Sequence, residues 1–150
     1  MNLLAIVGVW FVVFGSSSAF YSPSDDVIKL TGANFETAVL DSEKVWVVQF
    51  YATWCRYSQD LAPEYRRVAT ALKGVINVGA VNCEEGQAER KLCEQIVYID
   101  HYPTVLIFGA DKYSPLEYDG DNTAKDIFWV ALHEMEKSLP AKTYTDAERN

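Results

Sequence analysis

Two runs of almost continuous apolar and aromatic residues constrain the fold of this chain more than any other feature. The first, VWVVQFYA, covers residues 45–52, and the second, VINVGAVN, covers residues 75–82. Strands that are buried on both faces of a sheet have this composition, whereas strands with one wet face alternate apolar and polar residues. A long helical pattern runs from Cys55 toward Leu72, and we expect Pro63 to interrupt it. The sequence therefore predicts a sheet whose two faces are both covered.

The other segments complete an alternating order of strands and helices. A helix from Asn34 places Phe35, Ala38 and Val39 on one face, with Thr31 or Asn34 as its cap. We also expect a strand over 25–30, a polar helix over 85–95, two strands that begin at 104 and 115, and an amphipathic helix over 123–137. This order predicts an α/β fold with a mixed central sheet, helices on both faces and a single domain.

The two ends of the chain differ in character from the rest. Residues 1–19 contain an apolar run without charge and end in Ser-Ser-Ala, which predicts a signal peptide cleaved after Ala19 rather than a retained anchor. We expect residues 20–24 to be a loose tether, residues 25–138 to form the domain and residues 139–150 to be a flexible tail. After cleavage no membrane insertion is expected, because no later segment is apolar for long enough.

The chain carries a formal net charge of -8. A strongly acidic protein is repelled by phosphate groups, so nucleic acid and anionic membranes are excluded as expected partners. The charge also keeps a protein soluble, which is sufficient reason for it.

The stretch WCRYSQ, which begins at Trp54, contains the candidate reactive residue of the chain. Cys55 is expected at the first turn of a helix, where unsatisfied N–H groups and the helix dipole favour the thiolate. Arg56 would add a nearby cation if its side chain turned toward the sulfur. Cys55 is therefore a candidate nucleophile, and the alternative is a buried, inert thiol. Ser58 stands where a second, resolving cysteine would be needed.

Several motifs recur here in a familiar order: FYATWC, a proline eight positions after that cysteine, HYPT and YDGDNT. Together they resemble the thioredoxin fold, and specifically the first catalytic domain of the protein disulfide isomerase family, over residues 25–138. The resemblance implies location in the lumen of the endoplasmic reticulum and cysteine-containing client proteins or other oxidoreductases as partners. It implies no cofactor. The chain ends DAERN, without a KDEL-type signal, so secretion is the alternative.

Three positions depart from the family pattern. Ser58 cannot form or resolve a disulfide. Gln49 stands where the resemblance implies a buried acid that accepts the proton of the resolving thiol, and Asn122 stands where similar domains often carry an arginine. Gln49 alone could be drift that removes a buried charge, and Asn122 alone a turn preference. Jointly they indicate that the second, releasing step is lost. The letters CRYS also resemble the C-R-F-S motif of the monothiol retention protein of the endoplasmic reticulum.

The motif HYPT supplies the other side of the site. In the resembled fold a cis proline lies opposite the nucleophile, which implies a cis bond before Pro103 and contact between the backbone of Tyr102 and a client strand. The alternative is a trans proline that begins an edge strand. Trp54, Arg56, Tyr57, Tyr102 and Pro103 are thus the predicted client-binding residues. His101 receives no role, because a lone loop histidine is more often only solvated.

Three cysteines leave one unpaired in a secretory protein. Cys83 ends a strand and Cys93 lies in the next helix, so we predict a structural disulfide between them, with Cys55 free. The alternative is that one of this pair resolves Cys55, which needs a long reach. A metal site is not expected, because the cysteines lack short ligand spacing.

Two functions remain. The first is a secretory-pathway protein that acts on client cysteines through Cys55 as a monothiol, by trapping, retention or slow isomerisation. The second is a redox-silent, chaperone-like binding module that uses the same aromatic groove.

Overall fold

The computed structural model describes residues 19–140 of the chain. The strands are β1 (Ile28–Leu30), β2 (Trp46–Tyr51), β3 (Asn77–Asn82), β4 (Thr104–Phe108) and β5 (Leu116–Glu117). The helices are α1 (Arg56–Leu72), α2 (Gln87–Lys91) and α3 (Ala124–Ser138), with two π-helical turns, η1 (Glu36–Leu40) and η2 (Leu92–Ile96). The predicted order of strands and helices is confirmed.

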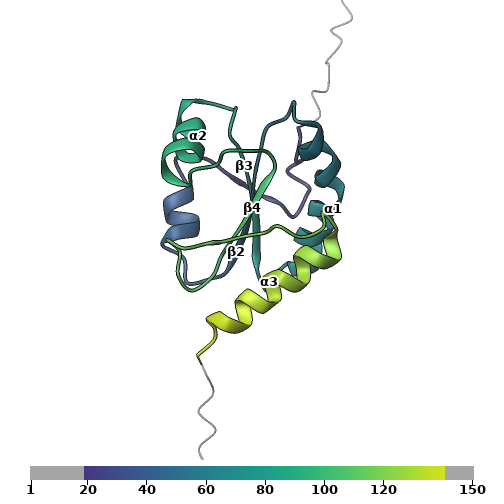
Figure 1. The fold of residues 1–150 in the computed structure, drawn as a ribbon, viewed down its shortest axis with the longest axis vertical. Helices are drawn as coiled ribbons and strands as arrows, with labels where there is room; N and C mark the ends of the chain where they lie inside the picture. Colours follow the sequence, from purple (N-terminus) through teal and green to yellow (C-terminus); the bar gives the residue numbers. More distant parts are fainter. Residues whose placement is uncertain (1–18, 141–150) are drawn as a thin grey trace, which may run out of the picture.

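The five strands form one mixed sheet in the order β1-β3-β2-β4-β5. Strands β1, β3 and β2 are parallel to one another, β4 is antiparallel to β2, and β5 is antiparallel to β4. Figure 1 shows α1 and α3 on one side of the sheet and α2 on the other. The predicted architecture, a mixed sheet between two helical layers in one domain, is therefore the observed one.

Each face of the sheet has its own apolar core, and β2 contributes to both. Val47 and Tyr51 belong to the cluster that contains the buried faces of α1 and α3. Val48 and Phe50 belong to the cluster on the opposite side, which includes residues of η1 and η2. All six residues of β2 are buried, as the continuous apolar run predicts.

Helix α1 differs from the prediction because it continues through Pro63. Proline removes one helical hydrogen bond and disfavours a helix interior. Here the helix buries one face against the sheet, including Leu61, Tyr65 and Val68, each at most 1% exposed. Burial of three such side chains is worth several kcal/mol at roughly 1.5–3 kcal/mol each, which exceeds the cost of about 3 kcal/mol for the proline.

Strand β3 begins two residues later than the apolar run suggests. The N–H groups of Val75 and Ile76 both donate to the carbonyl of Leu72, so these residues close the turn after α1. Gly74 lies in this turn with a φ of 81°. Glycine adopts such a left-handed conformation without steric cost, which lets the chain reverse sharply here.

The segment expected to be a loose tether is instead packed against the domain. We call residues 20–25 the N-terminal strap. The ring of Phe20 stacks on Tyr51 with 4.3 Å between centroids, and the ring of Tyr21 lies 5.5 Å from Tyr51 and 6.0 Å from Tyr65. Two aromatic side chains at the start of the segment therefore bury surface against β2 and α1, which a polar tether could not do.

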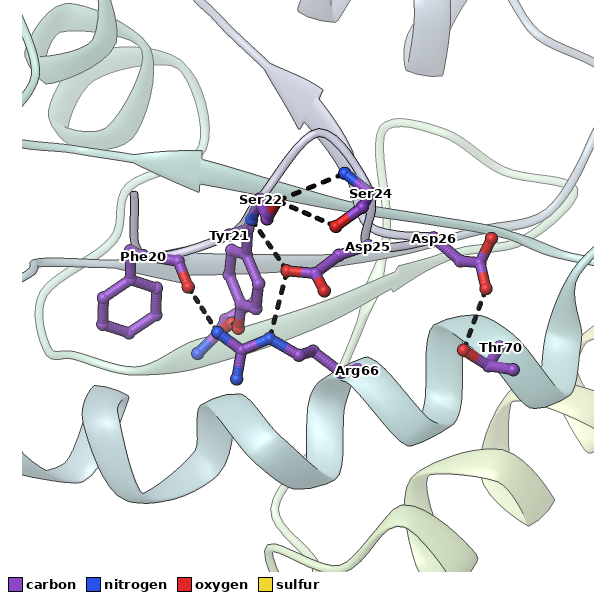
Figure 2. Close-up of polar contacts among 9 residues, drawn as sticks. Phe20, Tyr21, Ser22, Ser24, Asp25, Asp26, Arg66 and Thr70 are labelled. Atoms are coloured by element: carbon purple, nitrogen blue, oxygen red, sulfur yellow. Dashed lines mark hydrogen bonds and ion pairs between the residues drawn. The ribbon is translucent and has the colours of Figure 1, made fainter. Parts of the chain in front are cut away.

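Polar contacts fix the strap to α1 (Figure 2). Arg66 donates from Nη2 to the carbonyl of Phe20 at 2.6 Å and from Nε to the carboxylate of Asp25 at 3.1 Å. The same guanidinium lies over the ring of Tyr21, 5.3 Å from its centroid. Near the end of α1, Thr70 and the C-cap residue Lys73 both donate to Asp26, Lys73 at 2.6 Å.

The predicted signal peptide lies outside the described residues apart from Ala19, and so does the predicted tail apart from residues 139 and 140. Within residues 19–140, no helix is both long enough and apolar enough to cross a membrane.

Candidate functional site

Cys55 lies at the junction between β2 and α1, where it is the N-cap of the helix rather than part of its first turn. Its backbone is extended, with φ -77° and ψ 121°. The N–H of Cys55 donates to the carbonyl of Ala52 at 3.1 Å, which closes the turn that leads into the helix. The residue is 9% exposed, and its thiol donates to the carbonyl of Tyr102 at 3.4 Å. The free thiol is thus held against another loop of the chain.

That loop, residues 97–103, contains the predicted cis bond between Tyr102 and Pro103. We call it the cis-proline loop. The hydroxyl of Thr104 donates to the carbonyl of His101 at 2.8 Å and so ties the end of the loop to the start of β4. The ring of Tyr102 meets the ring of Trp54 edge to face, with 6.3 Å between centroids. Two aromatic rings therefore flank the thiol.

The exposed side of the site is aromatic. Trp54 is 68% exposed and Tyr57 is 69% exposed. Tryptophan and tyrosine are enriched in protein–protein interfaces, so these two rings offer a binding surface beside the thiol.

Arg56 does not turn toward the sulfur. Its Nε donates to the carboxylate of Asp60 one turn along the helix, at 2.9 Å, and its side chain is 81% exposed. The i, i+4 carboxylate competes for the guanidinium and holds it in solvent. The condition under which Arg56 would support the thiolate is therefore not met in this arrangement.

Ser58 and Gln49 are both completely buried. Ser58 lies on the face of α1 that packs against the sheet, and its hydroxyl has no hydrogen-bond partner among the described residues. The amide oxygen of Gln49 accepts a hydrogen bond from the hydroxyl of Tyr21, whereas its nitrogen is unpaired in the same part of the chain. A residue of the strap therefore contacts Gln49, and one polar group on each of Ser58 and Gln49 remains unpaired in the interior.

Asn122 lies in an exposed bend just before α3. Within residues 19–140 its side chain makes no hydrogen bond to Ser58 or Gln49. The structure thus unites Cys55, Trp54 and Tyr102, places Ser58 and Gln49 in the interior, and leaves Asn122 apart.

Cys83 and Cys93 form a disulfide, with 5.9 Å between their Cα atoms, and Cys55 is free. Both bonded cysteines are buried, with 1% and 0% of their surface exposed. Neither carries a free thiol that could resolve a mixed disulfide at Cys55. The structure therefore has the predicted Cys83–Cys93 disulfide and not the alternative in which one of these cysteines resolves Cys55.

The groups around the cis-proline loop influence one another's charge states. Partial burial raises the pKa of Tyr102, and the negative charges of Glu84 and Glu94 raise it further. The hydrogen bond from the ring of His101 lowers the pKa of Asp100. Within residues 19–140, no three His, Cys, Asp or Glu side chains gather as a metal site would require.

Sequence reasoning missed two residues that support the site. Gln59 donates from Nε2 to the carbonyl of Thr53 at 2.8 Å, which braces the turn that precedes Cys55. Tyr21 reaches Gln49 from a segment 28 residues away in sequence. A glutamine four residues into a helix and a tyrosine in a polar segment carry no sequence signal for either contact.

Comparison with known proteins agrees with this geometry. Residues 26–131 match the protein-family model described as Thioredoxin. The chain belongs to the thioredoxin family. As a family member it is 48% identical over 139 residues to "Protein disulfide-isomerase A6 homolog" of Drosophila melanogaster, covering 93% of this chain and 31% of the relative. It is 41% identical over 132 residues to "Protein disulfide-isomerase A6" of Homo sapiens, covering 88% of this chain and 29% of the relative.

Solved structures give the same result. The Trx4 domain of ERdj5 superposes with a TM-score of 0.62 at 32% identity, covering 75% of this chain and 98% of that domain. The J-Trx1 fragment of ERdj5 gives a TM-score of 0.67 at 27% identity, covering 77% of this chain and 52% of the fragment. The chain spans about a third of the length of the curated relatives that it matches.

Proposed function

We propose that this thioredoxin-family chain acts on client cysteines in the secretory pathway through Cys55 as a single nucleophile. One observation carries the proposal. The free thiol lies at the N-terminus of α1 against the cis-proline loop, between exposed Trp54 and half-buried Tyr102, and a serine occupies the resolving position. This combination supports bond formation with a client without a built-in release step.

The chemistry needs no oxidant or reductant. The thiolate of Cys55 attacks one sulfur of a client disulfide, a mixed disulfide forms, and the other client sulfur leaves as a thiolate. A second client thiolate then attacks the mixed disulfide, forms a new client disulfide and returns Cys55 as a thiolate. The client has exchanged one disulfide for another, so the overall reaction is isomerisation. If no client thiolate reaches the bond, the client stays trapped.

In this proposal the chain has no thiol of its own that could release a client from the mixed disulfide. Ser58 cannot attack the mixed disulfide, because a hydroxyl forms no disulfide with sulfur. Gln49 cannot accept a proton as a buried carboxylate would, and its oxygen is already bonded to Tyr21. Asn122 cannot supply the positive charge that an arginine would bring. These three positions support a function in trapping, retention or slow isomerisation rather than in rapid dithiol turnover.

The relatives support the setting of the proposal. Their printed names describe protein disulfide isomerases, and we propose that this chain likewise handles disulfides during protein folding, with cysteine-containing clients or other oxidoreductases as partners. We place it in the lumen of the endoplasmic reticulum, with the signal peptide over residues 1–19 as the route and secretion as the alternative. No cofactor or metal enters the proposed chemistry, and no nucleic acid is a proposed partner.

The exposed aromatic rings favour one second candidate. Trp54 and Tyr57 could hold unfolded segments without any bond to sulfur, as a chaperone-like module would. In that case Cys55 would be dispensable for binding.

The test is a non-reducing gel of cells that express the chain, with thiols quenched by N-ethylmaleimide before lysis. We expect the wild type to show a ladder of mixed disulfides. Cys55→Ser should remove the ladder, because no other free thiol remains. Ser58→Cys should thin it, because a resolving thiol one turn along the helix would release clients.

Two controls separate the candidates. Cys55→Ser should keep the melting temperature of the wild type, so that loss of the ladder reports chemistry and not folding. If all three proteins run as monomers, clients do not react with Cys55 and the proposed function is wrong. If clients still co-purify with Cys55→Ser without a covalent bond, the binding module is the better description.

A further inference from the structure

The disulfide begins a series of contacts that ends on the Cys55 thiol. Cys83 follows β3 directly, and its N–H donates at 2.9 Å to the carbonyl of Tyr51, the last residue of β2. Through the disulfide this edge of the sheet is covalently joined to Cys93 in η2. The disulfide therefore joins the end of β3 to the segment that leads into the cis-proline loop, and the hydrogen bond from Cys83 extends this connection to β2, the strand that leads into Cys55.

The cis-proline loop rests on the disulfide-bearing segment. The N–H of Ile99 donates to the carbonyl of Cys93 at 2.7 Å. Val97, Ile99 and Tyr102 also pack against the apolar cluster that contains both bonded cysteines. A shift of η2 would therefore move the loop as well, because the loop takes both a hydrogen bond and its packing from this region.

Tyr98 shows that the loop is held in place by its surroundings. Its φ is 56°, in the left-handed region that residues other than glycine seldom adopt. The side chain is 78% exposed, so its own packing does not stabilise this conformation. A strained residue persists where its neighbours determine the path of the chain. Here those neighbours are Val97 and Ile99, which are attached to the disulfide cluster.

We propose that the Cys83–Cys93 disulfide is a positioning element for the reactive thiol. It holds the cis-proline loop so that the carbonyl of Tyr102 stays on Cys55 and limits how often that thiol is open to attack. The disulfide does not itself exchange with clients, because both sulfurs belong to buried residues and exchange requires access. The inference rests on the proposed function in taking Cys55 as the reacting thiol, and it names what controls that thiol.

The test measures alkylation of Cys55 in the purified full chain by iodoacetamide, followed by mass spectrometry. The wild type is compared with Cys83→Ala/Cys93→Ala, and Cys55 is the single free thiol in both. We expect the rate to rise about tenfold in the double variant, since a freed loop exposes the thiol through local opening. Circular dichroism confirms that each protein is folded under the labelling conditions.

The matched control is Ile127→Ala. Ile127 is buried in the cluster on the other face of the sheet, so its truncation lowers stability without touching the loop. We expect the rate of Cys55 in this variant to stay within about twofold of the wild type. An equal rise in Ile127→Ala, or no rise in the folded double variant, overturns the inference.

A second variant decides the case if the double variant fails to fold. Tyr98→Pro keeps the disulfide, but proline cannot adopt a positive φ, so the loop must move. We expect faster alkylation of Cys55, and an unchanged rate would show that the loop does not control the thiol. Failure of client capture would leave these small-molecule rates unaffected, so the inference and the proposed function fail separately.

Discussion

The two ends of α1 differ in how many of their polar groups have hydrogen-bond partners. In its C-terminal half, Arg66 binds the N-terminal strap and Thr70 binds Asp26, the residue that follows the strap (Figure 2). The C-cap residue Lys73 also binds Asp26. At its N-terminus, the helix has no side-chain cap bond, and Ser58 buries an unpaired hydroxyl. One helix is therefore firmly attached at one end and incompletely satisfied at the other.

This difference separates stability from reactivity within one element. A protein interior normally pairs its polar groups, and exceptions concentrate at functional sites. At the strap end of α1, the side chains of Arg66, Asp25 and Asp26 all have partners, and this end should carry stability. The Cys55 region departs from that rule and should tolerate substitution with little cost to folding.

The largest change in the free energy of unfolding is expected for Tyr21→Ala, with Tyr57→Ala as the matched control. Tyr21→Ala removes a ring that packs against Tyr51 and Tyr65 and leaves the buried amide of Gln49 without its partner, so unfolding should become easier by about 2–4 kcal/mol. Tyr57→Ala removes a ring that is 69% exposed and should change stability by less than about 0.5 kcal/mol. Urea unfolding of both purified variants gives the comparison.

Equal losses in Tyr21→Ala and Tyr57→Ala would contradict the contrast between the two ends of α1. A loss confined to Tyr21→Ala sharpens it, because the strap is then part of the folded domain.

A smaller effect is expected at the resolving position. Ser58→Ala removes a buried hydroxyl that has no partner, so stability should stay unchanged or rise by up to about 1 kcal/mol. Ser138→Ala removes a hydroxyl that donates to the carbonyl of Glu134 at 2.8 Å, and should cost about 0.5–1 kcal/mol. Thermal unfolding of the two variants tests this opposite sign, and a clear loss in Ser58→Ala would show that its hydroxyl is satisfied.

The smallest effect is a pH dependence at the strap end of α1. Hydrogen bonds from Lys73 and Thr70 lower the pKa of Asp26. A carboxyl whose folded pKa is lowered stabilises the fold fully above its ordinary pKa of about 4, and this contribution is lost as pH falls through the folded value. The difference in stability between wild type and Asp26→Asn should therefore be present at neutral pH and vanish in acid.

Urea unfolding at several pH values between neutrality and strong acid measures this difference. Lys73→Ala should reduce the same pH dependence, because it removes one of the two donors. A difference that persists below the folded pKa would place its origin elsewhere than in the charge of Asp26.

Most of the fold could be predicted from the sequence, because short local patterns of apolar residues determine its strands and helices. The continuous apolar runs at 45–52 and 75–82 mark the two central strands, and helical periodicity marks α1 and α3. Turn residues were less informative. The N–H groups of Val75 and Ile76 close a turn rather than extend β3, which depends on where α1 ends in space.

The parts of the site that the sequence missed are contacts between distant segments. Nothing local in Tyr21 indicates that its hydroxyl meets Gln49, because the contact depends on how the strap crosses the sheet. The direction of the Arg56 side chain, which the sequence left open, is set by a local partner, since Asp60 accepts a hydrogen bond from its Nε. Cys83 and Cys93 were predictable because their short separation limits where they can lie.

The partner that holds the Cys55 thiol is a main-chain oxygen. Every amino acid at position 102 would bring that oxygen, so point mutation there cannot delete the acceptor. A substitution at position 102 would consequently change the ring that meets Trp54 and packs against the apolar cluster, but not the atom that accepts the hydrogen bond of the thiol. A contact made by the main chain is thus protected from point mutation, whereas the aromatic side chains around it can change one at a time.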